Sequence, residues 1–240
     1  MQLYFIRHAE STNNYNRRVT GSSKGRSDDP ELTTTGQKQA QLLAEFLRNN
    51  YSETSVPERD FQNATGFNFT HLYSSLMIRS VVTGTLISQA INLPLKAWVD
   101  IHECRGPYFR DDRTNAPIAT EGKNRAFFAA NFPELILPEY LGEVGWWNRP
   151  VEETEQWLVR AKRVVQELLE RHGNKDDRVA FVSHGGFYNC FLATLLNFPT
   201  GHYYSFILNN AAISRIDFEN DKVRLCYLNR LDFLPKDLIT

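Results

Sequence analysis

Hydrophobic and polar positions along the chain follow strand-like and helix-like patterns in turn. Gln2 to Ile6 is a short apolar run rich in aromatic and branched residues, which is typical of a buried strand. The same pattern recurs in three further runs, at residues 71–74, 96–101 and 178–182. Apolar residues at helical spacing predict four helices, at residues 40–47, 76–90, 151–171 and 187–196. Strands that alternate with helices predict a largely parallel α/β sheet.

Capping and turn residues refine this pattern. One of Thr33, Thr34 and Thr35 is expected to cap the first long helix, and Gly173 to end the helix at 151–171. The polar, Asn-rich segment 11–29 predicts a loop. Two final strands, 212–217 and 223–229, add an antiparallel hairpin. We therefore expect a three-layer α/β/α fold with a mostly parallel central sheet.

The segment from about residue 105 to 150 interrupts the alternation of strands and helices. Residues 105–149 carry four prolines, six basic residues and several large aromatic residues. This composition predicts either a lid-like insertion or a small subdomain. Both flanks belong to the same predicted sheet, so we expect residues 1–240 to form a single domain that contains this insertion. Trp146 and Trp147 are expected to be packing residues.

Composition and charge restrict the functional classes. Of the 240 residues, 27 are basic and 28 acidic, which gives a formal charge of -1 and no global field that favours nucleic acid or an anionic membrane. The three cysteines are far apart and include no C-x-x-C pair, as expected for reduced thiols in the cytosol. No apolar run approaches the roughly 20 residues that span a bilayer. We expect a cytoplasmic protein with no nucleic-acid or membrane partner, and its oligomeric state is unknown.

Five chemically capable residues fall at or just past the carboxyl ends of predicted strands, where ligands of open α/β sheets bind. They are Arg7, His8, Arg79, Glu103 and His184. Two guanidinium groups and helix N-terminal amides suit a phosphate-sized dianion. A neutral imidazole can act as nucleophile near pH 7, and a carboxylic acid can protonate a leaving oxygen. These residue types predict phosphoryl transfer with no metal and no other cofactor.

Competing motifs are incomplete. His8 and Glu10 give an H-x-E, but no P-C-x-x-C follows as in zinc deaminases. The Gly- and Ser-containing segment 21–27 lacks P-loop spacing, and Ser183 lies outside any G-x-S-x-G. No His, Cys or carboxylate set has structural zinc spacing.

The segment from Arg7 to Asn14 resembles the R-H-G-x-[ST]-x-x-N signature of the histidine phosphatase superfamily, which includes the cofactor-dependent phosphoglycerate mutases. The resemblance continues in order through Thr20-Gly21, Leu32-Thr33 with Gly36 and Gln39, Tyr73-Ser74-Ser75 with Arg79, Glu103 with Gly106, and Ser183-His184-Gly185-Gly186. It covers nearly the whole chain. Two departures stand out: Ala9 replaces the usual glycine, which we expect to tighten the pocket, and the residues after Glu103 match neither the phosphatases nor the mutases.

The resemblance implies a role for each matching residue. His8 would attack phosphorus through one ring nitrogen while a backbone carbonyl holds the other, and would form a phosphohistidine. Arg7, Arg79 and His184 would clamp the phosphoryl oxygens, and Glu103 would act as general acid and then general base. Four further residues would bind substrate: Asn14, which would orient the phosphoryl group, and Thr20, Gly21 and Gly185.

These observations favour a metal-independent phosphomonoesterase, a histidine acid phosphatase-like phosphoric monoester hydrolase that acts on a small phosphorylated molecule. A cofactor-dependent phosphoglycerate mutase is an alternative, supported by the Thr20-Gly21 match, whereas the segment 209–214 resembles the phosphatase branch. A second alternative is an inactive module that binds a phosphorylated ligand or a partner. The sequence does not identify the substrate.

Overall fold

The central sheet has six strands in the order β3-β2-β6-β1-β7-β8. The computed structural model describes residues 1–49, 60–111, 113–198, 205–219 and 222–240. The strands are β1 (Gln2–Arg7), β2 (His71–Ser74), β3 (Leu95–Ala97), β6 (Arg178–Ser183), β7 (Ile213–Glu219) and β8 (Lys222–Arg230). Strands β3, β2, β6 and β1 run parallel, while β7 pairs antiparallel with β1 and β8. The prediction of a mostly parallel sheet with a final antiparallel hairpin is confirmed.

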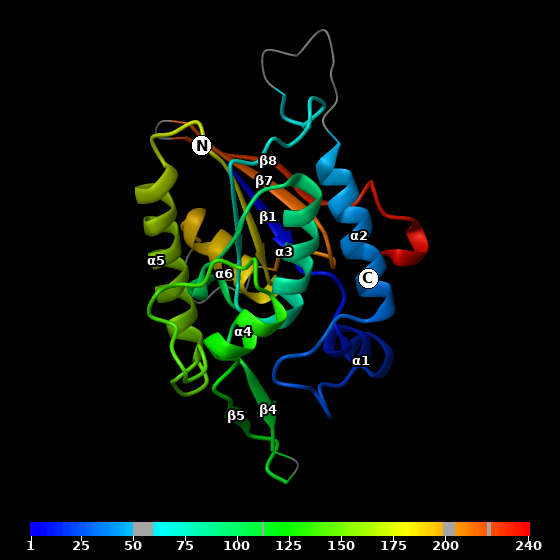
Figure 1. Ribbon diagram of the computed structural model, residues 1–240, viewed down its shortest axis with the longest axis vertical. Helices are drawn as coiled ribbons and strands as arrows, with labels where there is room; N and C mark the ends of the chain where they lie inside the picture. Colours follow the sequence, from blue (N-terminus) through cyan, green and yellow to red (C-terminus); the bar gives the residue numbers. More distant parts are fainter. Residues whose placement is uncertain (50–59, 112, 199–204, 220–221) are drawn as a thin grey trace.

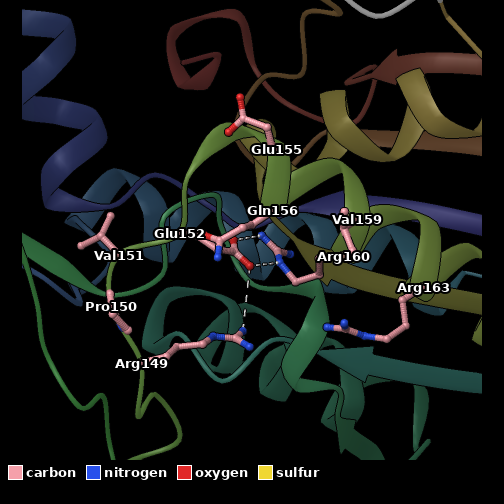
Figure 2. Close-up of a pocket in the computed structure, with 9 residues that line it drawn as sticks. All are labelled: Arg149, Pro150, Val151, Glu152, Glu155, Gln156, Val159, Arg160 and Arg163. Carbon is pink, nitrogen blue, oxygen red and sulfur yellow. Dashed lines mark hydrogen bonds and ion pairs between the residues drawn. The ribbon is translucent and has the colours of Figure 1, made fainter.

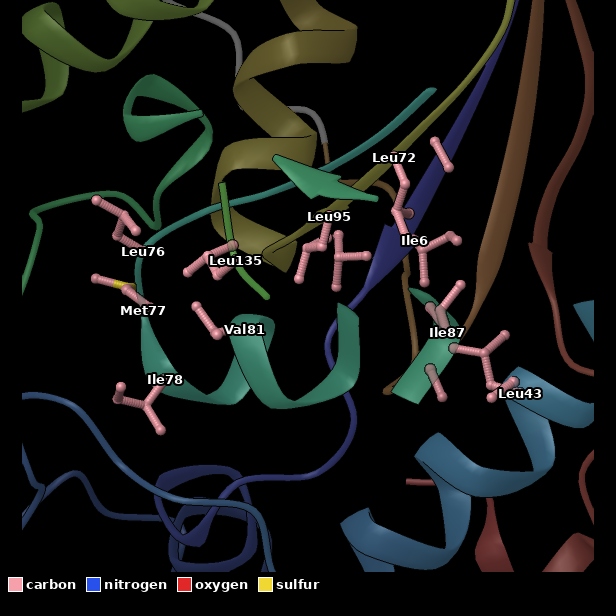
Figure 3. Close-up of a cluster of buried hydrophobic side chains, with 14 of the residues drawn as sticks. Ile6, Leu43, Leu72, Leu76, Met77, Ile78, Val81, Ile87, Leu95 and Leu135 are labelled. Atoms are coloured by element: carbon pink, nitrogen blue, oxygen red, sulfur yellow. The ribbon is translucent and has the colours of Figure 1, made fainter. Parts of the chain in front are cut away.

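Helices cover both faces of this sheet (Figure 1). Helices α2 (Thr34–Arg48) and α3 (Ile78–Ile91) pack on one face, and α5 (Thr154–His172) and α6 (Gly185–Leu195) on the other. Alternate residues of β1 supply both cores: Tyr4 and Ile6 face α2 and α3, whereas Leu3 and Phe5 face α5 and α6. Figure 3 shows the first core, where Ile6 lies near Leu72. The chain has the predicted three-layer α/β/α fold.

The register of three adjacent strands positions the site. Strands β1 and β6 are paired from their first residues to Arg7 and Ser183, and β2 pairs with β6 up to Ser74. The carboxyl ends of β2, β6 and β1 therefore lie side by side at one edge of the sheet. The residues that follow these strands, among them His8 and His184, meet there.

Helix α1 (Thr12–Thr20) lies within the segment predicted as a loop, so that prediction is wrong. The Ser11 hydroxyl accepts from the backbone N–H of Asn14, whose side chain accepts from the Ser11 N–H, forming a capping box. No side chain of α1 is buried, so the helix has no apolar stripe for a periodicity analysis to detect. Gly21 ends it in the left-handed region, at a φ of 67°.

The strand predicted at 96–101 is also shorter than expected. It covers only Leu95–Ala97 and is followed by a 3₁₀ turn, η1 (Val99–Ile101), which leads into Glu103.

Between η1 and α5 lie a small antiparallel hairpin, β4 (Tyr108–Arg110) and β5 (Pro117–Ala119), and the short helix α4 (Arg125–Asn131). The hairpin projects below the central sheet in Figure 1. Trp146 and Trp147 are buried, which confirms their packing role. A Cβ at Gly106, where φ is 76°, would lie 2.5 Å from the Trp147 ring, so this position requires glycine.

A second 3₁₀ turn, η2 (Lys236–Leu238), lies near the C-terminus. None of the helices in the described part of the chain is long and apolar enough to cross a membrane.

Candidate active site

His8 directly follows β1 and is 2% exposed. Its Nδ1 lies 2.7 Å from the Ala9 carbonyl oxygen, which can only accept, so Nδ1 carries the hydrogen and Nε2 keeps its lone pair. Arg79 donates from Nε to this Nε2 at 3.1 Å. Burial, together with the charges of Arg79 and Arg7, holds the pKa of His8 well below its ordinary value. His8 is therefore a neutral imidazole at neutral pH with Nε2 available as a nucleophile.

His184 lies beside His8, with the two ring centroids 5.0 Å apart. Its Nε2 is 2.7 Å from the Ser75 hydroxyl and 3.2 Å from the Ser80 hydroxyl. Nδ1 is buried and has no hydrogen-bond partner among the described residues. Burial, reinforced by Arg79 and His8, lowers the pKa of His184 well below its ordinary value. When a serine hydroxyl donates to Nε2, Nδ1 carries the hydrogen and can donate it to an anion.

Two arginines contribute further donors. Arg7 donates from Nη1 to the Leu208 carbonyl at 2.5 Å, while its buried Nε has no partner in the described structure. Arg79 Nη1 is likewise buried without a hydrogen bond there. Burial lowers the pKa of Arg7 to about 10, so the group is still protonated at neutral pH. An unsatisfied buried donor costs about 1–3 kcal/mol, a cost that a bound anion would remove.

Gly185 begins helix α6 over one of these guanidinium groups. A Cβ at this position would lie 3.5 Å from Arg7 Nε, which places the glycine in packing contact with the arginine.

The Glu103 carboxylate caps the start of α6. Oε1 accepts from the N–H groups of Cys104 at 2.9 Å and Phe187 at 3.0 Å, and Oε2 accepts from Gly186 at 3.3 Å. A Cβ on Gly186 would lie 2.3 Å from Oε1, so glycine permits this approach. The helix terminus stabilises the negative charge. The structure thus brings Glu103 to the helix that begins after His184.

A buried ion pair supports the backbone that precedes Glu103. Arg160 donates to both carboxylate oxygens of Glu152, at 2.9 and 2.8 Å, as Figure 2 shows. Its Nη1 also donates to the carbonyls of Asp100 at 2.7 Å and His102 at 3.0 Å. The pair lines a cavity of about 360 Å³ that contains none of the predicted site residues. Sequence analysis missed this support because an arginine on an amphipathic helix gives no signal of burial.

Asn14 connects to His8 through a residue that sequence analysis did not assign. Asn210 donates from Nδ2 to the His8 carbonyl at 3.1 Å and to Asn14 Oδ1 at 3.2 Å. Thr20 and Gly21 are exposed at the end of α1, and their hydrogen bonds stay within residues 16–22. The structure therefore brings Asn14 near His8 but does not join Thr20 or Gly21 to the cluster. Their substrate-binding roles stay predictions.

The backbone after His8 is held from α2. Ala9 is fully buried in a cluster with Leu32 and Ala40, and the expectation that its methyl tightens the pocket stays a prediction. The Glu10 N–H donates to Gln39 Oε1 at 2.7 Å. A Cβ at Gly36 would lie 2.0 Å from the Glu10 carbonyl oxygen. The Leu-Thr-x-x-Gly-x-x-Gln motif therefore holds the backbone after His8 in place.

Asp29 is a further residue that sequence analysis missed. Its Oδ1 accepts from the N–H of Ile78, the first residue of α3, at 2.9 Å and lies 3.8 Å from Arg79 Nη1. Burial raises the pKa of Asp29 to about 6, although Arg79 opposes the rise. The loop that carries Asp29 has no periodicity, so its position opposite α3 had no signal in the sequence.

A basic hollow adjoins the hairpin β4–β5. It has a volume of about 430 Å³ and is lined by Gly25, Arg26, Phe109, Arg110, Asp111 and Arg113. The Arg26 guanidinium lies 3.8 Å from the centre of the Tyr108 ring. Burial lowers the pKa of Arg79, and the charge of Arg26 adds to this effect, so Arg26 shares the electrostatic environment of the site. Arg18, on α1, pairs with Glu10 at 2.9 Å.

The remaining histidines have structural surroundings where the structure describes them. His102 is buried between the Glu103 carbonyl and Arg149. His172 lies 2.7 Å from Asp177 at the amino end of the sheet, with His71 nearby, the one group of potential metal ligands among the described residues. The remaining histidine, His202, lies outside the described residues.

The geometry defines an α/β protein with a buried histidine pair, two arginines and a carboxylate at the carboxyl edge of its sheet. The sequence profile of the histidine phosphatase superfamily (branch 1) matches residues 3–56 and 58–230. The chain therefore belongs to this superfamily.

Relatives and solved structures agree with that assignment. A protein described as a probable phosphoglycerate mutase GpmB from Yersinia pestis (strain Pestoides F) is 27% identical over 228 residues, which cover 91% of this chain and 86% of the relative. A phosphoserine phosphatase from Entamoeba histolytica, solved with 3-phosphoglyceric acid, has a TM-score of 0.61 at 20% identity and covers 98% and 99% of the two chains. A mycobacterial glucosyl-3-phosphoglycerate phosphatase has a TM-score of 0.56 at 18% identity, with 95% and 98% covered. These structures establish the likeness of fold.

Proposed function

We propose that the protein is a metal-independent phosphomonoesterase that forms a phosphohistidine at His8. The observation that carries this proposal is the neutral Nε2 of His8 beside three buried donors that make no hydrogen bond in the described structure, on Arg7, Arg79 and His184. Such preorganised donors stabilise the charge of a transferring phosphoryl group.

The chemistry has two steps. Nε2 of His8 attacks phosphorus while Arg7, Arg79 and His184 donate to the phosphoryl oxygens. Arg79 Nε, which donates to Nε2 in the structure, redirects its hydrogen to a phosphoryl oxygen. Glu103 enters this step in its protonated form and gives its proton to the leaving oxygen as the ester bond breaks. The Glu103 carboxylate then takes a proton from water, which attacks the phosphohistidine, releases phosphate and restores neutral His8.

We infer that the substrate carries a second anionic group. Arg26, whose charge acts on Arg79, lines the basic hollow with Arg110 and Arg113, and Asp111 is the acidic residue among the described residues of its lining. The names of two structural neighbours include phosphoserine and 3-phosphoglycerate, both of which pair a phosphate ester with a carboxylate. A carboxylate suits the arginines of the hollow.

A panel of phosphomonoesters tests both points, with His8→Ala as the blank. Phosphoserine and 3-phosphoglycerate should be hydrolysed faster than phosphoethanolamine and glycerol 3-phosphate, which lack the carboxylate. Labelled substrate, quenched in alkali, should leave acid-labile phosphate on the wild type and none on His8→Ala. Absence of both phosphate release and label would overturn the proposal, because a competent His8 must show at least one.

A mutase is a second candidate, since the curated relatives at 27% identity carry that name. A mutase returns the phosphoryl group to a second position of the substrate, whereas a phosphatase delivers it to water. Conversion of 3-phosphoglycerate to 2-phosphoglycerate, primed by 2,3-bisphosphoglycerate and without net phosphate release, would favour the mutase. Phosphate binding with neither reaction would favour the inactive binding module.

A further inference from the structure

Two cysteines lie together beside Glu103. The Sγ atoms of Cys104 and Cys190 are 3.6 Å apart, although the residues are 86 positions apart in the sequence. Both residues are free cysteines and half-buried. The third cysteine, Cys226, lies on β8 and contacts the Arg224 carbonyl.

The two thiols lie on the two segments that hold the Glu103 carboxylate. Cys104 donates its backbone N–H to Glu103 Oε1 at 2.9 Å. Cys190 is on helix α6, whose first turn supplies the N–H groups of Gly186 and Phe187 to the same carboxylate. A Cβ at Gly186 would lie 3.4 Å from Cys104 Sγ, so this thiol also packs against the start of the helix. A bond between the sulfurs would therefore act directly on the position of Glu103.

We propose that Cys104 and Cys190 form a reversible disulfide, a modification site whose oxidation lowers turnover at His8. The effect on turnover rests on the function proposed above, while the disulfide itself does not. Bond formation brings the sulfurs from 3.6 Å to about 2.05 Å, a movement assigned to the Cys104 loop because Cys190 is fixed in a helix. That movement shifts the backbone N–H that holds Glu103 Oε1.

A small disulfide such as oxidised glutathione is the oxidant. The Cys190 thiolate attacks one of its sulfurs and releases one glutathione thiolate. Cys104, after losing its proton, then attacks Cys190 Sγ in the mixed disulfide and releases the second glutathione. The two protein thiols lose two electrons, and one glutathione disulfide becomes two thiols. Either thiol can begin the exchange, because either sulfur can be the donor in the contact between them, and the sequence with Cys104 first balances in the same way.

The test uses the full chain equilibrated in glutathione buffers of increasing oxidised fraction. Each sample is alkylated, digested and mapped by mass spectrometry, and phosphatase turnover is measured on a parallel sample. We expect a Cys104–Cys190 peptide in oxidising buffer, with turnover lowered at least about tenfold because a displaced general acid loses part of a 10²–10⁴-fold contribution. Dithiothreitol should restore turnover.

Matched variants separate this site from other oxidation. Cys226→Ser should behave as the wild type, whereas Cys190→Ser should keep the same turnover in oxidising and reducing buffer. Absence of the crosslinked peptide overturns the proposal, as does a complete crosslink with unchanged turnover. If no phosphate ester is hydrolysed, the proposed function fails separately. In that case the disulfide is tested by peptide mapping alone. Its effect on the site is tested by calorimetry, which compares the orthophosphate affinity of the oxidised and reduced forms.

Discussion

A single backbone carbonyl selects the reactive nitrogen of His8. Because the Ala9 oxygen accepts from Nδ1, the lone pair is confined to Nε2, which points toward Arg79. Two nearby arginines and burial keep the ring neutral, so the nucleophile does not have to lose a proton first. The burial and positive charge that cost stability also make the ring reactive toward a phosphoryl group.

Replacing Glu103 with Gln tests the role of its proton. The amide oxygen can still accept from Cys104 and Phe187, so the start of α6 should stay capped, but no proton can be delivered. We expect kcat for an alkyl phosphate to fall about 10²–10⁴-fold. The loss should be much smaller for p-nitrophenyl phosphate, whose leaving group needs little protonation. Equal losses on both substrates would show that Glu103 has a structural role, and Glu155→Gln, at an exposed position, provides the control.

Asp29 gives a stability prediction with a defined sign. Burial raises its pKa to about 6 from an ordinary value of 3.8, so between these values the folded state binds more protons than the unfolded state. The protonated Asp29 carboxyl group therefore stabilises the folded state at low pH, and this stabilisation is lost as the pH rises through 6. Asp29→Asn removes this dependence, so its free energy of unfolding relative to the wild type should rise by about 2.4 kcal/mol from pH 4 to pH 7. Urea unfolding at both pH values measures it, and a constant difference would contradict the raised pKa.

The sequence predicts the strands and helices that have buried apolar faces, and it misses those that depend on polar contacts. Strands β1 and β6 are apolar because both of their faces are buried, so their ends, and with them His8 and His184, could be placed in advance. Helix α1 is stabilised by the Ser11 capping box and has no buried residue, so it could not be predicted from an apolar pattern. The contact of Asp29 with α3 bridges 49 positions, a distance at which local patterns carry no information.

The hairpin β4–β5 is the element expected to select the substrate. Arg110 lines the basic hollow from this hairpin. Removing one charge-assisted contact at this partly exposed position should cost about 1 kcal/mol, or roughly fivefold in kcat/KM. We expect Arg110→Ala to lower kcat/KM about fivefold for phosphoserine and to leave phosphoethanolamine unchanged. Steady-state kinetics on this substrate pair separate the two effects, and equal losses would contradict a role in carboxylate recognition.

For the whole molecule, the buried histidines make the free energy of unfolding sensitive to acid. His8, His102 and His184 are buried, and burial is the main reason that the pKa of each lies well below its ordinary value. In the unfolded chain each takes up a proton near pH 6.5, which the folded chain does not. Their contribution to stability is therefore complete above pH 6.5 and is lost as the pH falls below it. Asp29 acts in the opposite direction below about pH 6, whereas His71, whose pKa is also lowered by burial, adds to the effect of the three buried histidines.

The free energy of unfolding should consequently fall on acidification from pH 6.5, by about 1.4 kcal/mol per pH unit for each histidine once the unfolded ring is charged. Urea titrations at half-unit intervals from pH 7.5 to 5 measure the slope. Of the three buried histidines, His102 alone lies outside the phosphoryl site, so His102→Gln should make the slope shallower than that of the wild type without removing a phosphate ligand. Orthophosphate should raise stability at pH 7, because it binds the folded state alone. A slope unaffected by His102→Gln would mean that His102 takes up its proton without unfolding of the chain.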